Sequence, residues 1–149
     1  MIRKRVPGRD DRAIMALIRE QLLPVTRKTI PGVTADSKEL AVRLKRNVTY
    51  VAARGGNKPY GFITFSCKAG KLIIDMIAVG KRSQGRGIGS RLMKVAERHA
   101  AKGGCKSAFV FVSRWNGRAH RFYERLGYRA VGYVPVLQCD VLEKRLGSG

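Results

Sequence analysis

Apolar residues recur at two different spacings along the chain, and the spacing assigns each segment to a helix or to a strand. Four segments show the three- and four-residue spacing of a helix face. Their apolar positions are Ile14, Leu17, Ile18 and Leu22; Leu40 and Leu44; Ile88, Leu92, Val95, Ala96 and His99; and Ala119, Phe122, Tyr123 and Leu126. The segments rich in β-branched and aromatic residues predict strands over 2–6, 49–54, 60–67, 72–79, 107–112, 128–134 and 136–143.

Polar residues, prolines and glycines mark the ends of the predicted helices. Asp10 or Asp11 is expected to cap the first helix, Pro24 to end it, and residues 24–35 to form a loop. Asp36 and Glu39 form a capping box for the second helix. The third helix is expected to stop at Gly103-Gly104, and the fourth to run from an Asn116 cap to Gly127.

The turn sequences between strands predict the topology. GGNKP and KAGK join three strand segments closely enough for an antiparallel meander. The run SAFVFV over 107–112 is continuously apolar and predicts a strand that is buried on both faces. Strand and helix alternate in the second half, which requires at least one parallel pair with a right-handed crossover. The predicted class is therefore mixed α/β, with a sheet of six to seven strands and about four helices.

The length and composition are those of one folded domain. The chain has 149 residues, of which 44% are hydrophobic and 28% charged, enough for a hydrophobic core. We place the domain over 1–146 and interpret Gly147–Gly149 as a short flexible tail of the kind that cloning adds. No apolar run has the roughly 20 residues of a membrane span, and the first residues lack the apolar core of a signal peptide.

Three cysteines stand far apart in apolar surroundings, at Cys67, Cys105 and Cys139. Their spacing gives neither a metal motif nor a disulfide framework, so we expect no metal site. Buried reduced thiols of this kind favour a cytoplasmic location.

The charge is strongly basic. Thirty-one Lys and Arg against ten Asp and Glu give a formal net charge of +21. Such a field attracts anions of several kinds: nucleic acid, an acidic membrane surface or a phosphorylated ligand. A basic bias without a specific partner gives the same composition, so charge alone does not choose among them.

A glycine-rich loop separates the strand over 72–79 from the following helix. Its sequence is Gln84-Gly85-Arg86-Gly87-Ile88-Gly89, and Lys81, Arg82 and Arg91 surround it. Glycines permit left-handed backbone and close approach of a ligand, and the start of a helix offers unpaired amides to an anion. The G-x-G-x-G spacing matches neither the dinucleotide fingerprint nor the phosphate-binding P-loop. A tight turn before a solvated basic helix explains the loop equally well at this point.

A second segment, NGRAHRFYERLGY over 116–128, changes that balance. Its Asn116, Ala119, Phe122, Tyr123, Gly127 and Tyr128, taken with Gln84-x-x-Gly87-x-Gly89, make the chain resemble the GNAT superfamily of acyl-CoA-dependent N-acyltransferases. The resemblance covers nearly the whole chain. It implies acetyl-CoA as the cofactor and a GNAT-like fold with the parallel strand pair at the cofactor site.

The resemblance also assigns roles to particular residues. It implies that the backbone of the glycine loop holds the pyrophosphate of coenzyme A, that Ile77 and Val79 run beside the pantetheine arm, and that Asn116 contacts the cofactor. The loop positions are Gln84, Gly85, Arg86, Gly87, Ile88, Gly89 and Ser90.

Tyr123 and Asp75 are the candidate catalytic residues. The resemblance places the Tyr123 hydroxyl at the thioester sulfur, where a phenol can protonate the departing thiolate; the alternative is an ordinary core aromatic. Many relatives carry a glutamate where this chain has Ile73. Asp75, expected on the same strand face as Ile73 and Ile77, could accept a proton through water, orient the amine or bond nearby backbone. We expect His99 to pack on its helix and His120 to face solvent.

These residues predict an N-acetyltransferase that acts by direct attack of a primary amine in a ternary complex. The alternatives are a nucleic-acid- or ribosome-associated binding protein and an acyl-CoA sensor without efficient chemistry. The acceptor is expected to be a small molecule or peptide amine, and its side of the site to include residues 22–46, whose Lys and Arg suit an acceptor with a carboxylate or phosphate. The sequence leaves an oligomer and a weak nucleic-acid association open.

Overall fold

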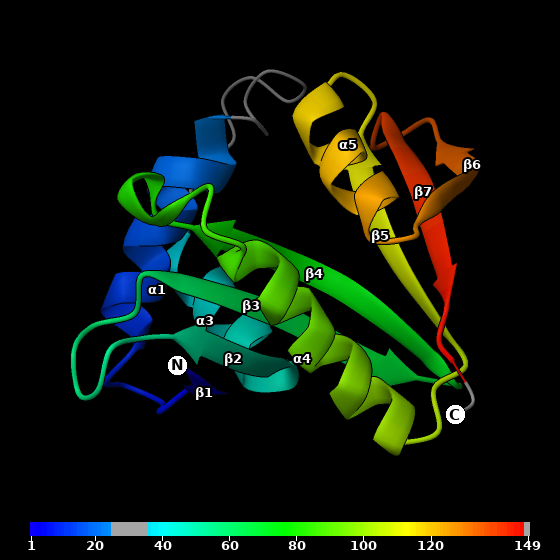
Figure 1. The fold of residues 1–149 in the computed structure, drawn as a ribbon. Helices are drawn as coiled ribbons and strands as arrows, with labels where there is room; N and C mark the ends of the chain where they lie inside the picture. The colour runs from blue at the N-terminus through cyan, green and yellow to red at the C-terminus, as the bar shows by residue number, and fades with distance from the viewer. Residues whose placement is uncertain (25–35, 148–149) are drawn as a thin grey trace.

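A seven-stranded sheet with helices on both faces forms the protein in the computed structural model, which describes residues 1–24 and 36–147 (Figure 1). The strands are β1 (Ile2–Lys4), β2 (Val48–Ala52), β3 (Gly61–Lys68), β4 (Lys71–Val79), β5 (Ser107–Ser113), β6 (Arg129–Val134) and β7 (Cys139–Arg145). The helices are α1 (Asp11–Leu17), which continues into the π-helical turn η1 (Ile18–Leu22), then α3 (Ser37–Arg46), α4 (Ile88–Lys102) and α5 (Gly117–Arg125), with a 3₁₀ turn η2 (Lys81–Ser83) before α4.

The strand order in the sheet is β1-β2-β3-β4-β5-β7-β6. All neighbours are antiparallel except β4 and β5, which are parallel and are connected through α4. The predicted antiparallel meander and single-domain α/β class are therefore confirmed. The loop expected over 24–35 falls almost wholly outside the described residues.

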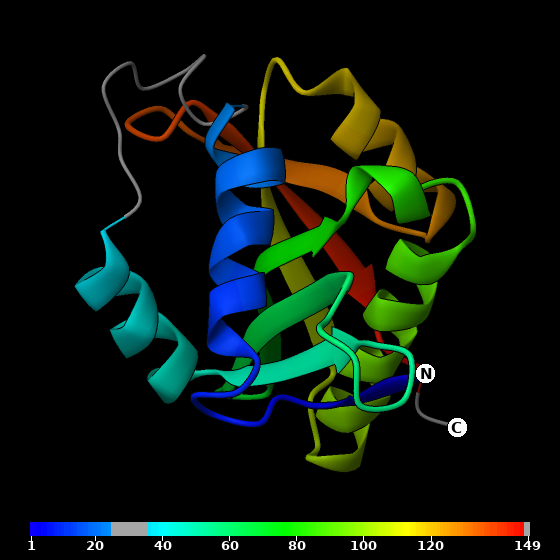
Figure 2. The same cartoon turned by 90° about the vertical axis from the view of Figure 1, so that its left-hand side faces the viewer.

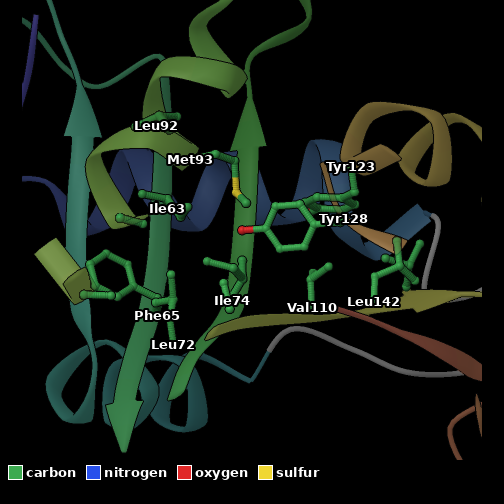
Figure 3. Close-up of a cluster of buried hydrophobic side chains, with 14 of the residues drawn as sticks. Ile63, Phe65, Leu72, Ile74, Leu92, Met93, Val110, Tyr123, Tyr128 and Leu142 are labelled. Atoms are coloured by element: carbon green, nitrogen blue, oxygen red, sulfur yellow. The ribbon is translucent and has the colours of Figure 1, made fainter. Parts of the chain in front are cut away.

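Two hydrophobic cores lie on opposite faces of the sheet, and Figure 2 shows helices on both of these faces. The helices α1 and α3 cover one face, where Ile14, Leu40 and Leu44 pack on Val51 and Phe62 of the strands. The other face carries α4 and α5. Its core joins Phe65, Ile74, Leu92, Met93, Val110, Tyr123 and Tyr128, among others (Figure 3).

The prediction that the strand over 107–112 is buried on both faces is wrong. Ala108, Val110 and Val112 lie in the core under α4 and α5, but Phe111 on the opposite face is 44% exposed. The apolar run showed that the segment is a strand. It could not show that Phe111 on the face of α1 and α3 stays partly uncovered.

The last two strands close the sheet. Residues 135–138 form the turn between them, so β7 begins at Cys139 rather than at Val136. β6 pairs only with β7 and has five exposed residues of six, which makes it an exposed sheet edge.

Asp10 anchors the first helix in a way that differs from the expected cap. It occupies the N-cap position but makes no capping hydrogen bond. Instead, its carboxylate accepts hydrogen bonds from Nη1 and Nη2 of Arg3 at 2.8 and 3.0 Å and from the Val6 amide at 2.7 Å. The side chain is 1% exposed. The hydrogen bond from Arg3, followed by that from the Val6 amide, lowers the pKa of Asp10 against the opposing effect of burial.

We predict that Asp10→Asn lowers the free energy of unfolding at pH 7 by roughly 1–3 kcal/mol, because a charge-assisted bond is lost and Arg3 keeps an unpaired charge. Since the folded pKa of Asp10 is below its ordinary value of 3.8, its stabilisation is complete above pH 3.8 and disappears as the pH falls through the folded pKa. Urea unfolding from pH 2 to pH 7 measures this. A difference in the free energy of unfolding between wild type and variant that stays constant across that pH range would contradict the prediction.

Candidate active site

The two parallel strands in the middle of the sheet pair only over their first halves. The ladder between β4 and β5 runs from Lys71–Ser107 to Ile74–Val110 and then stops. Beyond it, β4 continues to Val79 along β3 and β5 continues to Ser113 along β7, so the strands diverge (Figure 1). Among the described residues, the β4 edge beyond Ile74 has no strand partner on the β5 side, which leaves hydrogen-bonding groups available inside the sheet.

A β-bulge sits where the two strands part. In the β3–β4 ladder Thr64 pairs with Met76 and Phe65 with Ile74, so Asp75 is the extra residue. The bulge reverses the faces of β4: Ile74 lies in the core under α4, whereas Met76 lies in the core under α1 and α3. The expectation that Asp75 shares a face with Ile77 is therefore wrong. Asp75 lies with Ile73 on the α3 side, and Ile77 packs against the α4 core.

The Asp75 carboxylate is held by α3. Oδ1 accepts a hydrogen bond from Arg43 Nη2 at 2.5 Å, and Oδ2 accepts one from Arg43 Nε at 3.1 Å. The Asn47 amide donates a third bond, at 3.3 Å. These three bonds leave part of the carboxylate's capacity unused, since two oxygens offer about four lone-pair sites, and the side chain is 27% exposed.

The three glycines of the loop before α4 serve two different purposes. Gly85 and Gly87 have φ values of +79° and +76°, and a Cβ at either position would meet no atom within 4 Å. They are therefore required by the left-handed backbone of the turn. Gly89 is helical, and a Cβ there would stand 3.2 Å from the Phe122 ring of α5. It allows α4 and α5 to approach closely.

The first turn of α4 presents unpaired amides. Gly87 is its N-cap, no described side chain caps it, and the first amide bonded to the loop is that of Arg91, which donates to the Gly87 carbonyl at 3.1 Å. The amides of Ile88, Gly89 and Ser90 have no acceptor inside the helix. Together with the positive end of the helix dipole, they suit an anion.

The Gln84 side chain ties the loop to three other elements. Its Nε2 donates to the Val79 carbonyl at 2.9 Å and to Gln21 Oε1 at 2.8 Å, and its Oε1 accepts a bond from Arg118 Nη2 at 2.9 Å. Sequence reasoning assigned only the backbone of Gln84, and no spacing rule signals these contacts. The Val79 carbonyl, predicted beside the pantetheine arm, thus already accepts one hydrogen bond and retains a second lone pair.

Tyr123 of α5 lies in the core that also contains Ile74, Met93 and Val110, and is 6% exposed (Figure 3). Its ring meets the rings of Phe122 and Tyr128 edge-on, with centroids 5.0 and 5.8 Å apart. Burial raises the pKa of the Tyr123 hydroxyl far above its ordinary value of 10.0. The phenol therefore stays protonated throughout the physiological range.

The Tyr123 hydroxyl has no hydrogen-bond partner among residues 1–24 and 36–147. In that part of the chain, every fully enclosed side-chain nitrogen or oxygen does have one. The hydroxyl is therefore not bound by another side chain or backbone group of the described part of the chain, and the whole residue is 6% exposed.

Asn116 and His120 fix the start of α5. Asn116 caps the helix as predicted, with Oδ1 accepting from the Ala119 amide at 3.1 Å. The prediction that His120 faces solvent is wrong. Its Nε2 lies 2.9 Å from Asp140 Oδ2 of β7, and its Nδ1 lies 2.8 Å from the Asn116 carbonyl. His99 lies on the packed face of its helix as expected, where its ring contacts the rings of Tyr50 and Phe65.

In residues 1–24 and 36–147, no group of three or more His, Cys, Asp or Glu side chains is placed to hold a metal ion. None of the helices in that part of the chain is long and apolar enough to cross a membrane.

Comparison with known proteins finds acetyltransferases both among family models and among single relatives. Residues 15–128 match the model of the acetyltransferase (GNAT) family. The chain is 30% identical to acetyltransferase Atu2258 of Agrobacterium fabrum over 105 residues, which are 68% of this chain and 75% of that protein.

Solved structures share the fold. PaiA N-acetyltransferase of Thermoplasma acidophilum, solved in complex with coenzyme A, superimposes with a TM-score of 0.76 at 19% identity over 97% of this chain and 99% of its own. A phosphinothricin acetyltransferase of Sinorhizobium meliloti, solved with acetyl-CoA, superimposes with a TM-score of 0.80 at 17% identity. The match covers 100% of this chain and 89% of that chain.

The contact between Gly89 and Phe122 gives a testable prediction. In the wild type, Gly89→Ala brings a Cβ against the Phe122 ring, which opposes alanine's advantage of about 1 kcal/mol inside a helix. In a Phe122→Ala background only the advantage remains. We therefore expect Gly89→Ala to be more favourable there by roughly 1 kcal/mol, measured by urea unfolding in a double-mutant cycle.

Gly87→Ala is the matched control, because its penalty comes from a positive φ with no neighbour. It should destabilise both backgrounds equally. Equal effects of Gly89→Ala in the two backgrounds would show that this glycine does not set the approach of α5.

Proposed function

The chain belongs to the acetyltransferase (GNAT) family, and on that premise we propose that it transfers an acetyl group from acetyl-CoA to a primary amine by direct attack in a ternary complex. The observation that carries the proposal is the Tyr123 hydroxyl. It is a protonated phenol without a hydrogen-bond partner among residues 1–24 and 36–147, on the helix that packs against the glycine loop through Gly89 and Phe122.

The residues present fit coenzyme A. The unpaired amides at the start of α4 and the turn made by Gly85 and Gly87 form an anion site next to four cationic side chains, Lys81, Arg82, Arg86 and Arg91. We assign the pyrophosphate to the backbone of Gln84 to Ser90. The edge of β4 at Ile77 and Val79, which has no partner on the β5 side, would pair with the amide groups of the pantetheine arm, and Asn116 would contact the cofactor beside its capping bond.

When bound, acetyl-CoA supplies the acetyl group as a thioester, whose C–S bond breaks as the acceptor nitrogen forms the new C–N bond. Tyr123 would donate its proton to the departing thiolate and regain one from solvent after the products leave. Its position in a largely apolar core strengthens that hydrogen bond.

Asp75 is proposed to orient the amine and to receive its proton, directly or through water. Support comes from its place at the bulge where β4 and β5 part and from the lone pairs that Arg43 and Asn47 leave unused. Arg43 holds the carboxylate in one orientation, which suits a positioning group.

Coenzyme A is expected to raise the melting temperature, because a ligand that binds only the folded state stabilises it. At a concentration of 100 times Kd the shift should be roughly 5–10 °C. Differential scanning calorimetry at physiological salt measures it. ATP at the same concentration controls for the general attraction of anions to a chain of charge +21. No shift beyond that of ATP would refute the cofactor assignment.

Tyr123→Phe is expected to lower kcat roughly 100-fold through loss of the general acid, with KM for acetyl-CoA changed by no more than about twofold. Tyr128→Phe is the matched control, since that hydroxyl is also buried but donates to Glu97 at 2.7 Å; it should reduce stability more than turnover. Because the pKa of Tyr123 is raised, kcat should show no fall from loss of this proton up to about pH 10. Unchanged turnover in Tyr123→Phe would remove the acid role.

A further inference from the structure

A cavity of about 290 Å³ opens on the face of the sheet opposite α4, between α3 and the strands β3 and β4. Its polar lining consists of Arg43, Arg46 and Asn47 of α3 and its C-cap, Ser66 and Lys68 of β3, and Asp75 of β4. Ile73 contributes an apolar surface. The volume lies at the lower end of the range for small-molecule sites, so it fits a compact ligand.

The charges in this cavity do not balance. The Asp75 carboxylate is neutralised by Arg43 through two hydrogen bonds. Arg46 and Lys68 have no carboxylate partner in the described part of the chain. Two cations, one on α3 and one on β3, therefore line the same space, and neither is paired with a carboxylate of the described residues. This arrangement attracts a carboxylate or a phosphate.

The cavity adjoins the proposed reaction site through a single residue. Asp75 forms part of its wall and is also the bulge residue directly after Ile74, where the β4–β5 ladder ends. The β5 side of this face is open as well, since Phe111 is 44% exposed. A ligand in the cavity can thus extend past Asp75 toward the parting strands from the face opposite α4 and the glycine loop.

We propose that this cavity binds the acceptor and that the acceptor is a small amine carrying a carboxylate or a phosphate. The anionic group would lie between Arg46 and Lys68, and the amine beside Asp75. The inference rests on the proposed acetyl transfer and specifies its substrate class. It assigns selectivity to two residues that have no part in binding coenzyme A.

Two matched pairs of acceptors test the proposal: glycine against methylamine, and phosphoethanolamine against ethanolamine. The measurement is kcat/KM for the amine, followed by release of the coenzyme A thiol. The wild type is expected to prefer the anionic member of at least one pair by tenfold or more, and the pair that shows the preference identifies the anion. A preference for the neutral member of both pairs would overturn the proposal.

Arg46→Gln and Lys68→Gln identify where the preference arises. Each is expected to lower the ratio of kcat/KM between anionic and neutral acceptor roughly tenfold, because each removes one charge-assisted contact. KM for acetyl-CoA should stay unchanged. Lys45→Gln, an exposed lysine on the same helix that does not line the cavity, controls for the general loss of one positive charge and should leave the ratio intact. A double variant of Arg46 and Lys68 that keeps the wild-type ratio would refute the assignment.

Direct binding separates this proposal from the proposed function. Calorimetric titration with phosphoethanolamine and with glycine requires no turnover. If no amine were acetylated, the proposed function would fail. Binding of either compound that is about tenfold weaker in the double variant than in Lys45→Gln would still establish the anion site, and equal binding in the two would exclude it.

Discussion

The separation of β4 from β5 after four paired residues is the constraint on which the site depends. A strand in the middle of a sheet normally satisfies its backbone on both edges, and β4 does so only as far as Ile74. The bulge at Asp75 coincides with that point. One extra residue leaves Asp75 on the α3 side with Ile73 and reverses the faces of the side chains that follow it, so that Ile74 lies in one core and Met76 in the other. The same local irregularity therefore gives an open backbone edge and a carboxylate at its mouth.

The position of α5 is the second requirement, because it carries Tyr123. Three contacts determine it: the close approach of Phe122 to Gly89, the Asn116 cap, and the link from His120 to Asp140 of β7. None involves the Tyr123 hydroxyl itself. The phenol is thus held by its ring and its helix, which leaves its polar end for a ligand. Groups placed by rigid elements in this way keep their geometry without bonds to the reacting atoms.

The sequence predicted the elements and the class of site, because both follow from local spacing. Apolar periodicity located each described helix and strand to within a few residues, and the two motifs around Gly87 and Tyr123 gave the family. What the sequence could not supply was contact between distant segments. The bulge was hidden because Asp75 stands in regular alternation with Ile73 and Ile77. The partner of His120 lies twenty residues away, and the exposed face of β5 depends on where helices of another part of the chain end.

The glycines of the loop show the same limit on a smaller scale. The sequence allowed either a tight turn or the approach of a ligand for all three, whereas Gly85 and Gly87 are required by positive φ angles and Gly89 by the Phe122 ring.

Ion pairs account for only a small part of the positive charge of the chain. Ion pairs to Asp10, Asp11, Asp75 and Glu97 use few of the cations, and a nucleic-acid partner for the remainder stays a prediction.

The three hydrogen bonds of the Gln84 side chain have a consequence for the thermodynamics of ligand capture. A glycine-rich segment without such anchors samples many conformations, and a ligand that selects one of them loses affinity in proportion to the conformational entropy removed. Here the loop is fastened to η1, β4 and α5 in the free protein, so that entropy is lost during folding instead. The amides at the start of α4 are consequently preorganised, and binding should proceed with a smaller unfavourable entropy than the number of glycines suggests.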